Sequence, residues 1–139
     1  MSTLDSLIRL HRWQVDERRR HLADLDRLRD KLELDVQHLD AEERREQAAA
    51  AASPEAGYAY ASYARTLMAR RERLAQSIAE VDAEIAKARD ALAEAFQETK
   101  RYEIAAANRA KQARLQEARR QQGELDEIAV QAYQRREGA

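Results

Sequence analysis

The segment Ala52-Ser53-Pro54-Glu55-Ala56-Gly57 is the one place where proline and glycine come together in this chain of 139 residues. Turns are scarce elsewhere, because the sequence has only 1 Pro and 3 Gly. Ser53 and Pro54 suit the N-cap and the first position of a new helix, since serine accepts from free helix N–H groups and proline has no N–H to leave unbonded. The segment therefore predicts a chain reversal between two long helices.

Gly57 offers a second way to close this turn, with the next helix starting at Tyr58. On that basis we expect a first helix from about residue 3 to about 51, a turn over about 52–57 and a second helix over about 58–136. Ser2 followed by Asp5 predicts a capping box at the start of the first helix. The whole chain, residues 1–139, then forms a single coiled-coil domain.

Apolar residues recur every three or four positions on both sides of the turn, which is the heptad pattern of a coiled coil. The stripe before the turn is Leu4, Ile8, Val15, Leu22, Leu25, Leu32, Val36 and Leu39, and polar residues fill some of its remaining positions. The stripe after the turn is Ala64, Leu67, Arg71, Leu74, Ile78, Val81, Ile85, Ala88, Leu92, Ala95, Thr99, Tyr102, Ala106, Arg109 and Ala113. We expect an all-α fold, a long antiparallel two-helix coiled-coil hairpin.

Folding back about the turn places the two stripes face to face, with Val36 near Leu74 and Leu25 near Ile85. The charges agree with this antiparallel arrangement. We expect Glu42, Glu43 and Glu46 near Arg65, Arg70 and Arg71, and Arg18, Arg19 and Arg20 near Asp90 and Glu94. Exposed ion pairs add little stability, so the charges select the register and the apolar seam holds the helices together.

The second helix is longer than the first, which predicts a C-terminal single-helix overhang from about residue 107. The first part of the overhang is basic, with Arg109 and Arg114. Its apolar or aromatic residues have no partner in the first helix; they are Leu115, Leu125, Ile128 and Tyr133. Three interpretations remain open for it. The overhang is a solvated, partly helical tail with a weak point at Gly123, a surface for a partner protein, or a surface covered by a second copy of the chain.

Composition argues against catalysis, cofactors and metals. Aromatic residues make up 5% and charged residues 37%, the balance of long solvated helices and not of a conventional core. There is no Cys, and His11, His21 and His38 have no metal-site spacing. With so few glycines no phosphate-binding loop is possible, and no nucleophile motif occurs. We expect no enzyme and no cofactor.

Location and charge narrow the class of partner. MSTLDSLIRLHRW at residues 1–13 lacks a continuous apolar segment, so we expect neither secretion nor membrane insertion but a cytoplasmic protein. The net charge of −1 gives no overall attraction to nucleic acid or to an anionic membrane. A basic helix over residues 100–120 that binds nucleic acid is the weakest alternative, because stacking aromatics are lacking there.

Three of the five tyrosines, Tyr58, Tyr60 and Tyr63, lie within six residues beside the turn. Tyrosine suits protein interfaces, because its ring is apolar and its hydroxyl is polar. Two interpretations carry equal weight. Tyr60 and Tyr63 stack back on Val36 and Leu39 as a plug at the end of the coiled coil, or the cluster contacts a partner, and both can be true together. Trp13 is likewise either a packing residue or an exposed anchor for a partner.

Four strings together resemble the flagellar export protein FliJ family: SLIRLHRWQVDERRRHLADLDRL at 6–28, GYAYASYARTLMARRERL at 57–74, KRYEIAAANRAK at 100–111 and ELDEIAVQAYQRR at 124–136. The likeness covers essentially the whole chain. Heptads alone do not predict the aromatic tip or the Leu125-Asp126-Glu127 element. A departure is the alanine-rich seam after Ala88, which makes the coiled coil slim.

This resemblance implies a soluble, non-enzymatic component of the flagellar type III export apparatus with a stalk-like two-helix coiled coil. It implies three partners: the export ATPase ring, the cytoplasmic part of the export gate, and the export chaperones, which deliver substrates. It places the protein in the cytoplasm, peripheral to the basal body at the inner membrane. We assign Leu39, Tyr60, Tyr63 and Leu67 at the tip to the gate, and the six overhang residues named above to the ring. A passive coiled-coil spacer is the main alternative.

Overall fold

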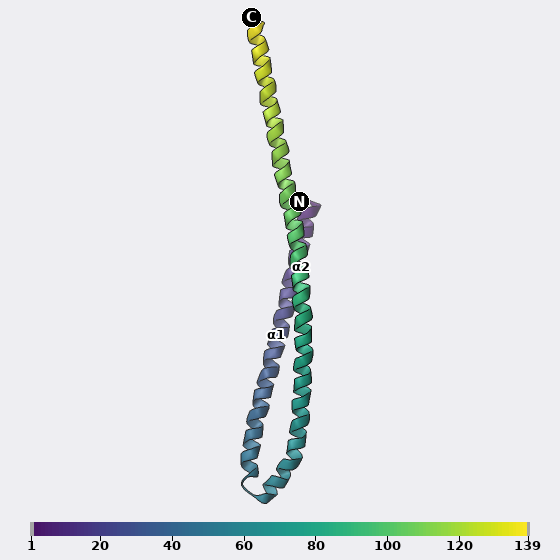
Figure 1. The fold of residues 1–139 in the computed structure, drawn as a ribbon, viewed down its shortest axis with the longest axis vertical. Helices are drawn as coiled ribbons and strands as arrows, with labels where there is room; N and C mark the ends of the chain where they lie inside the picture. Colours follow the sequence, from purple (N-terminus) through teal and green to yellow (C-terminus); the bar gives the residue numbers. More distant parts are fainter. Residues whose placement is uncertain (1, 139) are drawn as a thin grey trace. The chain divides into compact units, whose positions relative to one another are not determined.

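Two long helices make up residues 2–138, the part of the chain that the computed structural model describes (Figure 1). Helix α1 spans Thr3–Ala50 and helix α2 spans Pro54–Glu137. No strand occurs among these residues. The expected all-α class is confirmed, and two long helices that pack against each other agree with a coiled-coil hairpin.

The start of α1 is held by the capping box expected from the sequence. The Asp5 backbone N–H donates to the Ser2 hydroxyl at 3.1 Å, and the Ser2 backbone N–H donates to the Asp5 carboxylate at 3.2 Å. Each bond satisfies a donor that the first helical turn leaves free. The bonds with Ser2 lower the pKa of Asp5, because they favour the charged carboxylate.

The turn between the helices is shorter than expected. The Ser53 hydroxyl accepts from the Ala56 N–H at 3.1 Å, and the Ser53 carbonyl accepts from the Gly57 N–H at 3.1 Å. Helix α2 therefore begins at Pro54, which confirms the start that Ser53 and Pro54 predict, and the alternative start near residue 58 is wrong. The physical reason is that Ser53 caps and Pro54 initiates the helix, so Gly57 belongs to its first turn.

Residues 13–95 form one compact unit, in which the two helices run antiparallel on either side of the turn (Figure 1). Its buried apolar residues come from both stripes: Val15, Leu39, Leu67, Val81, Ile85 and Ala88. Three arginines of this unit join the helices by ion pairs. Arg29 binds Asp82 at 2.7 Å, Arg70 binds Glu42 at 3.1 Å, and Arg71 binds both Asp40 and Glu43. The pairing expected for Glu42 and Glu43 with Arg70 and Arg71 is thus present, whereas Glu46 and Arg65 of the same expected set form no ion pair.

The second expected set of cross-helix charges does not form. Arg19 pairs with Asp16 and Arg20 with Glu17, one turn away on α1 itself, and no ion pair joins Arg18, Arg19 or Arg20 to Asp90 or Glu94. For Arg19 and Arg20 the reason is an acid three positions earlier on the same helix, which already lies within reach, whereas Arg18 has no acid at that spacing and forms no ion pair. These arginines therefore select no register.

A second compact unit contains residues 2–12 and 96–138, which join the beginning of α1 to the C-terminal part of α2. Ile8 is buried at 7% exposure and Thr99 at 5%, and the His11 ring stacks on Tyr102 with centroids 4.6 Å apart. Further along α2 the environment changes, since every residue from 107 to 138 is exposed. The helix nevertheless continues through Gly123 without a break.

Candidate interaction surfaces

Tyrosines beside the turn form the first candidate surface, here called the tip cluster (Tyr58, Tyr60 and Tyr63). Tyr58 is 82% exposed, whereas Tyr60 and Tyr63 are half-buried, with ring centroids 6.2 Å apart. The Gln47 side-chain amide donates to the Tyr60 hydroxyl at 3.1 Å, which ties the second tyrosine to α1. The cluster therefore offers one free ring and two rings partly held by the hairpin.

Leu39 and Leu67 lie in the seam of the same unit, each only 2% exposed. The two leucines expected at a partner surface thus serve in this conformation as packing residues of the hairpin. Burial raises the pKa of Tyr63, and the neighbouring Glu42 carboxylate raises it further, because a tyrosinate there would be poorly solvated and close to a like charge. The Tyr63 hydroxyl is buried without a hydrogen bond of good geometry.

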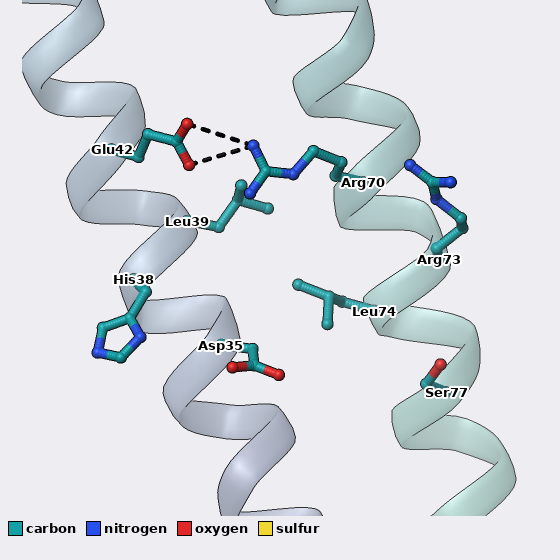
Figure 2. Close-up of a pocket in the computed structure, with 8 residues that line it drawn as sticks. All are labelled: Asp35, His38, Leu39, Glu42, Arg70, Arg73, Leu74 and Ser77. Carbon is teal, nitrogen blue, oxygen red and sulfur yellow. Dashed lines mark hydrogen bonds and ion pairs between the residues drawn. The ribbon is translucent and has the colours of Figure 1, made fainter.

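A groove of about 360 Å³ runs beside Leu39 and Leu74 between the two helices (Figure 2). Figure 2 shows these leucines between the helices, with the Glu42–Arg70 ion pair next to them. The hydrogen bond from Arg70 is the main cause that lowers the pKa of Glu42. The remaining lining residues are Asp35, His38, Arg73 and Ser77. Because acids line one wall and arginines the other, the groove resembles a solvated salt-bridge layer.

The second candidate surface is residues 107–137 of α2, here called the distal helix. Its large apolar side chains are well exposed: Leu115 at 43%, Leu125 at 61%, Ile128 at 61%, Val130 at 50% and Tyr133 at 62%. Arg109 and Arg114, assigned with them from the sequence, are also exposed. Exposed apolar residues repeated along one helix make this segment a candidate surface, because long helices gain most of their stability by burying an apolar face.

The Lys100, Tyr102 and Glu103 side chains lie where the N-terminal part of α1 meets α2 within the second unit. Glu103 accepts from Lys100 at 3.2 Å and from Arg12 at 3.2 Å, and these bonds lower its pKa, Lys100 being the larger cause. Tyr102 stacks on His11. Tyr102 and Glu103 therefore hold the start of α1 against α2, through His11 and Arg12, just before the distal helix begins.

Residues 2–138 hold no group of three or more histidine, aspartate or glutamate side chains that would bind a metal. Within the same residues no helix is apolar enough over a sufficient length to cross a membrane. Asp35, His38 and Ser77 all line the groove, but no hydrogen bond joins the serine to the histidine or the aspartate. The candidate functional features are therefore the tip cluster and the distal helix, which could bind other proteins.

The residues assigned to partners from the sequence leave out several exposed side chains of α2. Tyr58 is more exposed than the two tyrosines assigned to a partner, and Met68 on the same helix is 69% exposed. Val130 on the distal helix was also overlooked. A helical projection of the exposed apolar positions would have found Val130, but no local signal distinguishes the exposure of Tyr58 from that of Tyr60.

Comparison with known proteins gives one consistent match. The family model described as flagellar FliJ protein matches residues 1–138. Proteins named flagellar FliJ protein from two strains of Caulobacter vibrioides are 33% identical to this chain over 129 residues, covering 90% of each chain. No solved structure matches the chain significantly. The match spans both candidate surfaces.

Proposed function

Since this chain belongs to the flagellar FliJ family, we propose that it acts without catalysis as a stalk-like coiled coil that binds the export ATPase ring and the export gate. Family membership makes it a component of the flagellar export apparatus. The proposal adds how it works there, in the cytoplasm at the basal body. The observation that supports it most is that every residue from 107 to 138 is exposed, including the large apolar side chains.

The distal helix binds the ATPase ring in this proposal. Leu115, Leu125, Ile128 and Tyr133 would each contribute about 1.5–3 kcal/mol at best if a partner buried them fully. Arg109 and Arg114 would act mainly on the rate of association, because charges at the edge of an interface steer the encounter more than they hold the complex. Apolar substitutions should therefore raise the dissociation rate, and arginine substitutions should lower the association rate.

The tip cluster binds the cytoplasmic part of the export gate. Tyr60 and Tyr63 provide the contact together with the exposed Tyr58, while Leu39 and Leu67 support these rings from the seam beneath. The buried leucines would touch the gate only if the end of the hairpin opened. We also assign to the protein a role in delivering export chaperones and their substrates, which rests on family membership alone.

The ring assignment is tested by the ATP hydrolysis of the purified export ATPase in the presence of this chain. A variant with Leu115, Leu125, Ile128 and Tyr133 all changed to Gln should no longer stimulate hydrolysis. Leu28→Gln with Leu34→Gln is the matched control, because these leucines are exposed on α1 at 43% and 51%. Equal stimulation by both variants would show that the distal helix is not the ring surface.

A separate binding measurement tests the tip. The Tyr58→Ala, Tyr60→Ala and Tyr63→Ala triple variant should lose binding to the isolated cytoplasmic domain of the gate, measured by calorimetry. Met68→Ala removes an exposed side chain outside the cluster and should bind as the unchanged chain does. If the triple variant keeps its helical spectrum and its affinity, the tyrosines are a plug of the hairpin and not a docking surface.

A further inference from the structure

The face of α2 that packs against α1 loses its apolar character after residue 106. Within the second unit this face is defined by Thr99, which is buried, and by Tyr102 and Ala106, which are half-buried. The same heptad spacing continues beyond residue 113 through Gln116, Arg120, Gly123, Glu127, Val130 and Gln134. Only one of those six positions carries a large apolar side chain, so the seam of the hairpin is not prolonged along the distal helix.

A second heptad stripe begins on another face of the distal helix. It consists of Leu115, Ala118, Gln122, Leu125, Ala129 and Ala132, all exposed, with Ile128 and Tyr133 at its edges. This stripe is displaced by two positions from the first, which is about 200° around a helix of 3.6 residues per turn. A helix that merely continued the path of α1 would therefore not cover it.

We propose that, when the distal helix is not bound to the ring, this second stripe pairs antiparallel with the same stripe of a second copy of this chain. Ring binding and self-association then exclude each other, because both bury Leu115 and Leu125. The spacing is self-complementary, because Leu115 of one copy then faces Ala132 of the other and Ala118 faces Ala129. At the centre Gln122 faces Leu125. Each of these contacts occurs twice about a two-fold axis, and a large side chain opposite a small one lets the two helices approach closely.

Charged residues beside the stripe favour a second copy of the chain as the partner, and they favour an antiparallel orientation of the two helices. In an antiparallel pair Arg119 lies next to Asp126 of the second copy, again twice. Within residues 2–138 Arg119 has no ion pair, although its neighbour Arg120 binds both Glu117 and Glu124. Asp126 accepts from the Gln122 amide at 2.9 Å but has no cation beside it in the described part of the chain. A second copy supplies the missing charge to both residues.

The order of charge along the distal helix agrees with this pairing. The part before residue 121 is basic, with Arg109, Lys111, Arg114, Arg119 and Arg120 against Glu117, and the next part is acidic, with Glu124, Asp126 and Glu127. Antiparallel copies therefore bring the end of each basic block to the acidic block of the other. Arg114 and Arg135 of opposite copies approach at the ends, where solvent screens their repulsion.

Two single charge reversals test the pairing in the full-length chain. Arg119→Asp and Asp126→Arg should each weaken self-association by at least about tenfold in sedimentation equilibrium, because each puts two like-charged pairs across the interface. An equimolar mixture of the two variants should associate again. In the mixed pair the new aspartate at position 119 meets the new arginine at position 126, and the original Asp126 and Arg119 meet at the second place. An unchanged chain that remains monomeric up to millimolar concentration, or a mixture that stays monomeric, would overturn the proposal.

A disulfide experiment tests direction and register, and the absence of cysteine from the sequence makes it clean. Chains with Ala118→Cys and Ala129→Cys, mixed and oxidised, should form a covalent heterodimer. The Ala118→Cys chain alone is the matched control and should cross-link poorly, because its two cysteines lie well apart in an antiparallel pair. Preferential cross-linking of the control would contradict the antiparallel pairing. Both experiments use this chain alone, so their outcome is independent of the ATPase ring.

Discussion

Replacing Leu67 by alanine tests the seam that holds the hairpin of residues 13–95 together. Leu67 is 2% exposed, so the substitution removes nearly the whole of its buried side chain from the apolar seam. Leucine-to-alanine changes in protein cores cost about 2–5 kcal/mol. A two-helix seam is open at its sides and its neighbours relax, so we expect the lower end, about 2–3 kcal/mol. For a urea dependence of about 2 kcal/mol per molar, the unfolding midpoint then falls by about 1 M.

Leu34→Ala is the matched control, because the same side chain on α1 is 51% exposed. Its free energy of unfolding should change by less than about 0.5 kcal/mol, as for most surface substitutions. The assay is urea unfolding followed by helical circular dichroism at low protein concentration. Equal costs for Leu67→Ala and Leu34→Ala would refute the reasoning, since burial in the seam would then not decide stability.

Three further changes have expected outcomes. Ser53→Ala should lower the free energy of unfolding by about 1 kcal/mol in the same assay, because the cap of α2 is lost, whereas Ser62→Ala within the helix should not lower it. Gly123→Ala should stabilise the distal helix locally by about 0.5–1 kcal/mol, because alanine favours the helix more than glycine does and a Cβ there meets nothing within 4 Å. Proteolysis within the distal helix should therefore be slower, and faster cleavage would contradict this. The ion pairs of Glu42 and Glu103 lower the pKa of both carboxyls, so their stabilising effect is present above the ordinary value of 4.5 and is lost as the pH falls through the lower folded-state pKa. The melting temperature should therefore drop on acidification below about pH 4.5, and less so in Glu42→Gln; a profile unchanged by Glu42→Gln would show that this pair contributes nothing.

Local patterns predicted much of the fold. The heptad stripes indicated both helices, and Ser2 with Asp5 indicated the capping box, because these features depend on spacing within one or two turns. The 42–43 and 70–71 charges followed from folding the stripes together. The start of α2 was misplaced because Gly57 suits both a turn and a helix, and the Ser53 cap decides between them.

Sequence patterns could not predict whether a charged side chain pairs with a residue on its own helix or with one on the other helix. Arg19 and Arg20 have acidic neighbours on their own helix as well as across the seam, and the structure shows them with the former. Burial within the tip was equally hidden, since Leu39 and Leu67 look the same in sequence whether they face a partner or the seam. The assigned gate and ring residues remain predictions that await binding measurements.

Hydrolysis of ATP by the export ATPase, measured with the full chain and with a chain that ends after residue 107, tests the central proposal most directly. The shortened chain keeps the whole hairpin of residues 13–95 and the contacts of Ile8 and His11 with their unit, so it should melt as a folded helical protein. We expect it to have lost all stimulation of the ATPase. Full stimulation by the shortened chain would contradict the proposal and leave the distal helix without a role at the ring.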